Sequence, residues 1–138
     1  LDTIQAVVLL NKFKIFDSEI VSRNQIADKY SQELHSVLET PYISDGNISS
    51  WAQYSLLCKD EIQRDKLIKK ININGVPTAI YYKKPFNQLD LYKNICDKSY
   101  PVSENHSLCI FSIPMHPYLE DSEIDKISNF IISSLSND

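Results

Sequence analysis

The chain has 138 residues, of which 43% are hydrophobic and 10% aromatic, so it can fill one modest core and fits a single domain. Its formal net charge is -4, and its lysines are scattered among acidic residues without a basic stripe, which argues against nucleic acid as a partner. The longest apolar run, Ala6 to Leu10, is far shorter than the roughly 20 residues that a membrane-spanning helix needs. We therefore expect a soluble protein without a membrane partner.

The first 40 residues are predicted to be helical. Apolar residues recur at helical spacing on both sides of Asp17, whose side chain can accept a free backbone amide and so cap a helix. The pattern predicts two helices or one bent helix. Its apolar residues are Ile4, Val7, Val8, Leu10, Phe13, Phe16, Ile20, Ile26, Ala27, Tyr30 and Leu34.

A polar break from Pro41 to Ser50 separates this helical segment from the rest of the chain. Trp51 to Cys58 is then rich in strand formers and predicts a strand. The charged stretch from Asp60 to Ile73 carries its apolar residues on one side, which indicates a helix.

A helix stop and a short strand are predicted next. Asn74-Gly75 can form a left-handed turn that ends the helix, and Pro77 prevents the helix from resuming. Thr78 to Lys83 is β-branched and aromatic at its start, which is typical of a strand, and Pro85 lacks the donor that a longer ladder would need.

The C-terminal third is predicted to contain a short helix near Leu89 to Ile95, a turn at Pro101 and a strand from Leu108 to Ile113. A last helix starts at Glu120, and its apolar stripe consists of Ile124, Ile127, Phe130, Ile131 and Leu135. We therefore predict an α+β fold: a small antiparallel sheet of about three strands flanked by helices, with a long N-terminal helical segment.

No metal site or phosphate loop is predicted. The three cysteines include no Cys-x-x-Cys pair, the three histidines are too dispersed for a ligand cluster, and only two glycines are present. Free thiols fit a cytoplasmic protein. The residues concerned are Cys58, Cys96, Cys109, His35, His106, His116, Gly46 and Gly75.

The strongest candidates for a ligand contact are Tyr81 and Tyr82, at the end of the predicted Thr78 to Lys83 strand. Adjacent strand residues point to opposite faces, so one phenol can bind a ligand while the other packs. The alternative is that both are ordinary strand residues with hydrated hydroxyls. Trp51 and Tyr54 are interpreted as core residues, and His116, between two prolines, as the cap of a rigid loop.

Four segments in the same order resemble the DegT/DnrJ/EryC1/StrS sugar aminotransferases. Thr78-Ala79-Ile80-Tyr81-Tyr82 with Pro85 resembles that family's Pro-Thr-Ala-(Ile/Val)-(His/Tyr)-Tyr-x-x-Pro segment. The other three segments are Leu1-Asp2-Thr3-Ile4-Gln5-Ala6 with Phe16-Asp17, Ile48-Ser49-Ser50-Trp51-Ala52-Gln53-Tyr54, and Ser112-Ile113-Pro114-Met115-His116-Pro117-Tyr118-Leu119. The resemblance covers essentially the whole chain.

The resemblance implies a fold-type I enzyme that depends on pyridoxal phosphate and transfers an amino group to a keto sugar carried on a nucleoside diphosphate. It implies that residues 1–40 connect to a large domain and that residues 41–138 are the C-terminal small domain. The Schiff-base lysine and the cofactor's acidic partner would lie in the large domain, so this chain alone is expected to be inactive and to contain no catalytic residue.

In this family the (His/Tyr)-Tyr pair reaches across a homodimer interface toward the sugar nucleotide, which implies that Tyr81 and Tyr82 bind substrate. Many sugar-acid aminotransferases have His at the first position, and a phenol cannot provide the positive charge of an imidazolium. The chain begins with Leu1 and its only methionine is Met115, which indicates part of a longer protein.

Two alternative functions remain at this point. The chain can be a non-catalytic binding or dimerisation module whose apolar N-terminal helix is free for a partner. It can also belong to a sugar dehydratase of the same family, in which the Schiff-base lysine is replaced.

Overall fold

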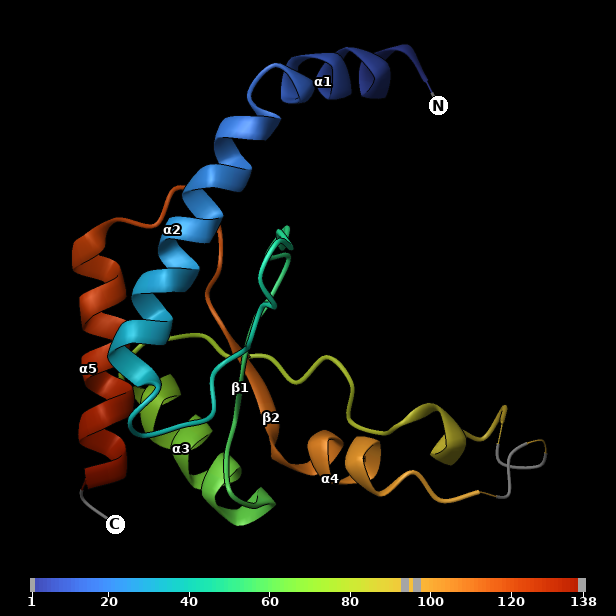
Figure 1. Ribbon diagram of the computed structural model, residues 1–138, viewed down its shortest axis with the longest axis vertical. Helices are drawn as coiled ribbons and strands as arrows, with labels where there is room; N and C mark the ends of the chain where they lie inside the picture. The colour runs from blue at the N-terminus through green and yellow to red at the C-terminus, as the bar shows by residue number, and fades with distance from the viewer. Residues whose placement is uncertain (1, 93–94, 96–97, 137–138) are drawn as a thin grey trace.

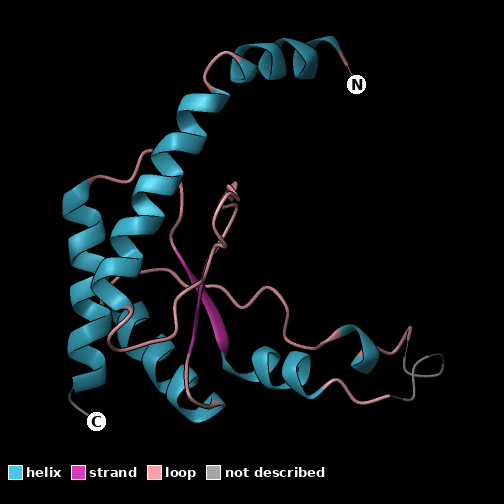
Figure 2. Ribbon diagram, in the orientation of Figure 1, coloured by secondary structure: helices cyan, strands magenta, loops and turns pink. Residues whose placement is uncertain are grey.

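The computed structural model describes residues 2–92, 95 and 98–136 as an α+β fold, which confirms the predicted class (Figure 1). Helices surround a small antiparallel sheet (Figure 2). The elements in chain order are α1 (Thr3–Phe13), α2 (Phe16–Leu34), β1 (Tyr54–Leu57), α3 (Glu61–Ile73), the 3-10 helix η1 (Phe86–Gln88), α4 (Pro101–Cys109), β2 (Ile110–Ile113) and α5 (Asp121–Ser136).

The N-terminal segment consists of two helices that meet at an angle (Figure 1). The Asp2 side chain caps α1 by accepting a hydrogen bond from the Gln5 amide at 2.8 Å. The prediction that Asp17 caps the second helix is wrong. Helix α2 begins at Phe16, so Asp17 lies inside its first turn instead of preceding it. There its carboxylate can still interact favourably with the positive N-terminal end of the helix dipole.

Helix α1 buries none of its residues within this chain. It projects away from the rest of the molecule in Figure 1, and its large apolar side chains between Ile4 and Phe13 are 44% to 79% exposed. Polar contacts hold its C-terminal end: Glu19 of α2 accepts hydrogen bonds from Lys12 and from the Tyr118 hydroxyl. The Lys12 ammonium also lies 5.7 Å from the centre of the Tyr118 ring.

The sheet pairs β1 with β2 in antiparallel register, from Tyr54 opposite Ile113 to Leu57 opposite Ile110. The predicted third strand is reduced to a single bridge, in which Ala79 and Ser112 exchange both backbone hydrogen bonds, at 3.0 and 2.7 Å. The two-stranded sheet is therefore smaller than the predicted one.

Two features prevent the Ala79 bridge from extending into a third strand. In one direction, the next hydrogen-bonded pair would be Pro77 opposite Pro114, and neither proline has an N–H. In the other direction, the pair would be Tyr81 opposite Ile110, but the Ile110 amide already donates to the His106 carbonyl at the end of α4. Only the bridge between these two positions forms.

The predicted end of α3 is confirmed. Asp60 caps the start of the helix by accepting a hydrogen bond from the Gln63 amide at 2.7 Å. At the other end Gly75 has a φ of 80°, and the Val76 amide donates to the Ile71 carbonyl at 3.2 Å. This turn directs the chain toward the bridge at Ala79.

The turn predicted at Pro101 is instead the start of α4, where proline is tolerated because the first helical N–H has no intrahelical partner. The Glu104 carboxylate supports this start by accepting a hydrogen bond from the Tyr100 amide at 2.9 Å. The helix predicted near Leu89 to Ile95 includes residues 93 and 94, which lie outside the described residues, as does Cys96; η1 ends at Gln88.

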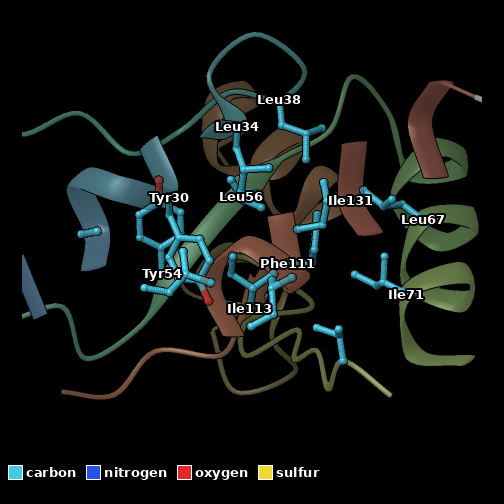
Figure 3. Close-up of a cluster of buried hydrophobic side chains, with 14 of the residues drawn as sticks. Tyr30, Leu34, Leu38, Tyr54, Leu56, Leu67, Ile71, Phe111, Ile113 and Ile131 are labelled. Atoms are coloured by element: carbon cyan, nitrogen blue, oxygen red, sulfur yellow. The ribbon is translucent and has the colours of Figure 1, made fainter. Parts of the chain in front are cut away.

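The core lies between α2, α3, α5 and the sheet, as Figure 3 shows. Tyr30 and Tyr54 are fully buried with ring centres 5.1 Å apart, and Trp51 lies 5.5 Å from Tyr54. The prediction that Trp51 and Tyr54 are core residues is confirmed.

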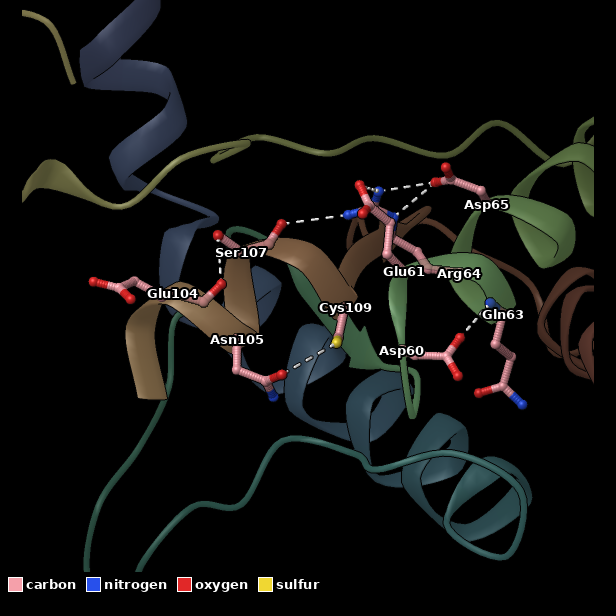
Figure 4. Close-up of polar contacts among 9 residues, drawn as sticks. All are labelled: Asp60, Glu61, Gln63, Arg64, Asp65, Glu104, Asn105, Ser107 and Cys109. Carbon is pink, nitrogen blue, oxygen red and sulfur yellow. Dashed lines mark hydrogen bonds and ion pairs between the residues drawn. The ribbon is translucent and has the colours of Figure 1, made fainter. Parts of the chain in front are cut away.

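A buried arginine joins α3 to α4 (Figure 4). The Arg64 guanidinium donates to the Glu61 carboxylate at 3.2 Å, to the Asp65 carboxylate at 2.9 and 3.0 Å, and to the Ser107 carbonyl at 3.3 Å. Because these nearby acceptors satisfy the hydrogen-bond donors of the guanidinium, we interpret Arg64 as a structural residue.

Replacing Gly75 by valine should destabilise the fold. No heavy atom lies within 4 Å of the position that a Cβ would occupy, so the penalty is backbone strain at positive φ, about 1–2 kcal/mol. Gly75→Asn is the matched control, because asparagine tolerates this conformation better. Thermal unfolding should give a clearly lower melting temperature for Gly75→Val than for Gly75→Asn, and equal values would contradict the argument.

The protein should become less stable at mildly alkaline pH because the Cys58 thiol is buried. Burial raises the pKa of the Cys58 thiol to about 12, so the folded protein keeps this proton while the unfolded chain releases it above its ordinary value of 9.0. The stability that the buried thiol contributes is fully present below the pKa of Cys58 in the unfolded chain, and it is lost as the pH rises toward the pKa of Cys58 in the folded protein. The free energy of unfolding should drop by about 1 kcal/mol between about pH 9 and pH 10. In Cys58→Ala, chemical denaturation over this range should show a shallower decrease; an unchanged slope would refute the assignment.

Candidate functional site

A cavity of about 200 Å³ lies where the bridge at Ala79 meets the two strands. Its walls come from three segments: the approach to β1, the segment after α3, and the end of β2 with the loop that follows. The lining residues are Ala52, Gln53, Pro77, Thr78, Ala79, Tyr81, Ser112, Ile113, Pro114 and Met115. We take this cavity, called the Tyr81 cavity below, as the candidate site.

The structure separates the two candidate tyrosines. Tyr81 lines the cavity and is 57% exposed, whereas Tyr82 is 70% exposed and is absent from the cavity wall. Within the described part of the chain, no hydrogen bond satisfies either hydroxyl. Neither ring packs into the core, so both phenols are available to a partner or a ligand that approaches from outside. Their role in binding stays a prediction.

The polar groups of the Tyr81 cavity are neutral. The Ser112 hydroxyl is bonded to the Ser55 hydroxyl at 2.8 Å, and Thr78 Oγ1 donates to Asn72 Oδ1 at 3.1 Å. Gln53 supplies an amide, and none of the described residues that line the wall carries a charged side chain. Such a cavity can hold an uncharged polar group by shape and hydrogen bonding, but it contains no acid, base or amine to carry out chemistry.

His116 faces a different cavity, of about 270 Å³, whose residues include Gly75, Glu123 and Lys126. Pro77 and Pro114 line both cavities, so His116 and Tyr81 belong to two adjoining cavities rather than to one. His116 Nδ1 accepts a hydrogen bond from the Tyr118 amide at 3.3 Å. This contact agrees with the interpretation of His116 as the cap of its loop.

The Tyr81 cavity does not fit a pyridoxal phosphate site. Lys83 and Lys84 are exposed and line neither cavity, and the Tyr81 cavity has neither a lysine to bind the aldehyde nor an acidic residue to pair with the pyridine nitrogen. Among the residues that the structure describes, no group of three or more His, Cys, Asp or Glu side chains could hold a metal ion.

Sequence reasoning missed Gln53 and Met115 as cavity residues. Both lie in segments that resemble the family, but the sequence prediction concerns their neighbours Trp51, Tyr54 and His116. The available signal was position: Gln53 precedes a strand and Met115 follows one, and residues at strand ends often face a ligand.

A sequence model of the DegT/DnrJ/EryC1/StrS aminotransferase family matches residues 1–132. The chain belongs to this family. The match confirms the resemblance predicted from the four segments. No helix in the described ranges is both long enough and apolar enough to span a membrane.

The most informative relatives are two bacterial proteins. The UDP-2-acetamido-2-deoxy-3-oxo-D-glucuronate aminotransferase of Pseudomonas aeruginosa is 36% identical over 99% of this chain, which covers 36% of that protein. The crystal structure of a DegT DnrJ EryC1 StrS aminotransferase from Brucella abortus has 40% identity and a TM-score of 0.90, over 98% of this chain and 36% of that one. The chain thus spans about a third of the length of the proteins it matches.

A more distant structure, from Streptococcus pneumoniae, has the same fold and was solved in a PLP form. It is 22% identical with a TM-score of 0.77, over 93% of this chain and 34% of that protein.

Proposed function

We propose that the chain is part of a pyridoxal phosphate-dependent aminotransferase that aminates a keto sugar carried on a nucleoside diphosphate, in the biosynthesis of amino sugars or bacterial surface glycans. One observation carries this proposal: 36% identity over 99% of the chain to an aminotransferase that acts on a UDP-linked keto sugar acid. In this proposal the enzyme is a cytoplasmic homodimer that takes its amino group from an amino acid.

The same comparison supports a proposed domain organisation. The matched proteins are about three times as long as this chain, so residues 41–138 are proposed as the small domain and residues 1–40 as its connection to a large domain. The exposed apolar side of α1 supports this arrangement, because a surface of this kind is normally covered by another part of a protein.

The large domain would supply the catalytic groups. The cofactor acts as the electron sink for amino transfer, and the Tyr81 cavity offers it neither a lysine nor an acidic residue. We therefore assign binding rather than chemistry to this chain. Tyr81 and Tyr82 would contact the substrate, and the neutral Tyr81 cavity suits an uncharged, hydroxyl-bearing part of a nucleotide sugar better than its phosphates.

Removing the Tyr82 hydroxyl should weaken substrate binding. In the full-length enzyme, Tyr82→Phe keeps the ring and removes one donor, so KM for the nucleotide sugar should rise about threefold to tenfold with a smaller change in kcat. Tyr42→Phe is the control, because Tyr42 is a similarly exposed tyrosine that lines neither cavity. Identical kinetic constants for Tyr82→Phe and the wild type would remove Tyr82 from the site.

The 138-residue chain by itself should form no covalent adduct with pyridoxal phosphate. Its lysines beside the tyrosine pair, Lys83 and Lys84, are exposed and line neither the Tyr81 cavity nor the His116 cavity, unlike a Schiff-base lysine, which lies in a pocket that desolvates it. After incubation with pyridoxal phosphate and borohydride, mass spectrometry should find no selectively modified lysine. Stoichiometric labelling of one lysine would contradict the proposal that the cofactor site lies elsewhere.

A further inference from the structure

Helix α2 reaches two walls of the Tyr81 cavity through one side chain. Arg23 Nη1 donates to the Trp51 carbonyl at 2.8 Å and makes a longer contact, 3.5 Å, with the Met115 carbonyl. Trp51 directly precedes Ala52 and Gln53 on one wall, and Met115 belongs to the opposite one. The guanidinium therefore ties two segments that are distant in sequence to the same helix.

Asn24, the next residue of α2, also binds the segment that leads to Ala52 and Gln53. Asn24 Oδ1 accepts a hydrogen bond from Trp51 Nε1 at 3.0 Å, and Asn24 Nδ2 donates to the Ser49 carbonyl at 3.1 Å. Together, Arg23 and Asn24 contact both the backbone and the side chain of Trp51.

Trp51 needs this support because its backbone is strained. Its φ is 45°, and among the described residues it is the only one other than glycine with positive φ. A bulky residue in this region persists only where its surroundings determine its conformation. The bend at Trp51 sets the direction in which Ala52 and Gln53 leave toward the cavity.

The wall that contains Tyr81 is held by β2 rather than by α2. The segment from Pro77 to Tyr81 is joined to β2 by the Ala79 bridge, and no described hydrogen bond links it to α2. On the β2 side, Tyr30 of α2 donates to the Pro114 carbonyl at 3.1 Å. The spacing of the Gln53 and Met115 walls therefore depends on α2, while Tyr81 follows β2.

We propose that Arg23 and Asn24 are positioning residues of the substrate site. They hold Trp51 in its left-handed conformation and fix the Gln53 wall against the Met115 wall, so that the cavity beside Tyr81 keeps one shape. Their role in substrate affinity rests on the proposed function, whereas their role in holding the two walls does not.

The test compares variants of the full-length protein. Arg23→Met keeps the aliphatic stem and removes the donors, Asn24→Leu removes acceptor and donor, and Arg23→Lys keeps the charge. Lys29→Met is the matched control, because Lys29 is a cation of the same helix whose partners, Asp121 and Asp125, do not line the Tyr81 cavity. The readouts are peptide-resolved amide hydrogen exchange and the kinetic constants for a UDP-linked keto sugar.

In Arg23→Met and Asn24→Leu, exchange should become faster in residues 49–53 and 114–116 and stay unchanged in residues 61–73. KM should rise about tenfold while kcat changes less, because the walls bind the substrate and do not carry out the chemistry. Arg23→Lys should recover most of the affinity, since its ammonium can still reach one carbonyl, and Lys29→Met should change neither readout.

Two results would overturn the inference: unchanged exchange in both variants, or faster exchange with a KM no higher than that of Lys29→Met. The second result leaves the proposed function intact, because the same assay measures wild-type activity. A wild-type enzyme that turns over no nucleotide sugar refutes the proposed function instead. The exchange data then decide alone whether Arg23 and Asn24 hold the two walls.

Discussion

The antiparallel ladder between β1 and β2 is short, yet the arrangement of the other elements depends on it. It aligns Tyr54, Leu56, Phe111 and Ile113, which are buried on the side that α2, α3 and α5 cover. The third segment that reaches this ladder finds only one pair of free backbone groups, at Ser112. Continuing this register would place Pro77 opposite Pro114, and neither has an N–H, so the ladder ends there and both prolines line the candidate cavity.

Helix α2 connects this core to the candidate site. Its apolar face packs into the core through Tyr30 and Leu34, which are fully buried. In its N-terminal half, Arg23 and Asn24 bind the backbone of both segments that border the cavity. The same helix therefore contributes to folding and to the shape of the site, so a shift of α2 would change both.

The contrast between α1 and α2 agrees with a chain that belongs to a larger assembly. Both helices carry apolar residues at helical spacing, but α2 buries its stripe from Ile26 to Leu34, whereas α1 exposes its own. The proposed aminotransferase accounts for this difference, because its large domain would cover α1. In the same proposal, the walls of the Tyr81 cavity and the two phenols would bind substrate, while the large domain would hold the cofactor.

The sequence by itself determined the family, the α+β class, the positions of the principal helices, the left-handed turn at Gly75 and the burial of Trp51 and Tyr54. These features depend on local periodicity, on turn chemistry and on motifs in a fixed order, all of which can be read from residues that are close together in the sequence. Only the tertiary structure decided that the third strand is a single bridge, that Pro101 starts a helix, and that Gln53 and Met115 face Tyr81. The physical reason is that the third strand depends on Ser112 and Pro114, and the Gln53 and Met115 walls on Arg23, all distant in sequence from the segments that they affect. Proline is compatible both with a turn and with the first turn of a helix, so Pro101 alone does not choose between them.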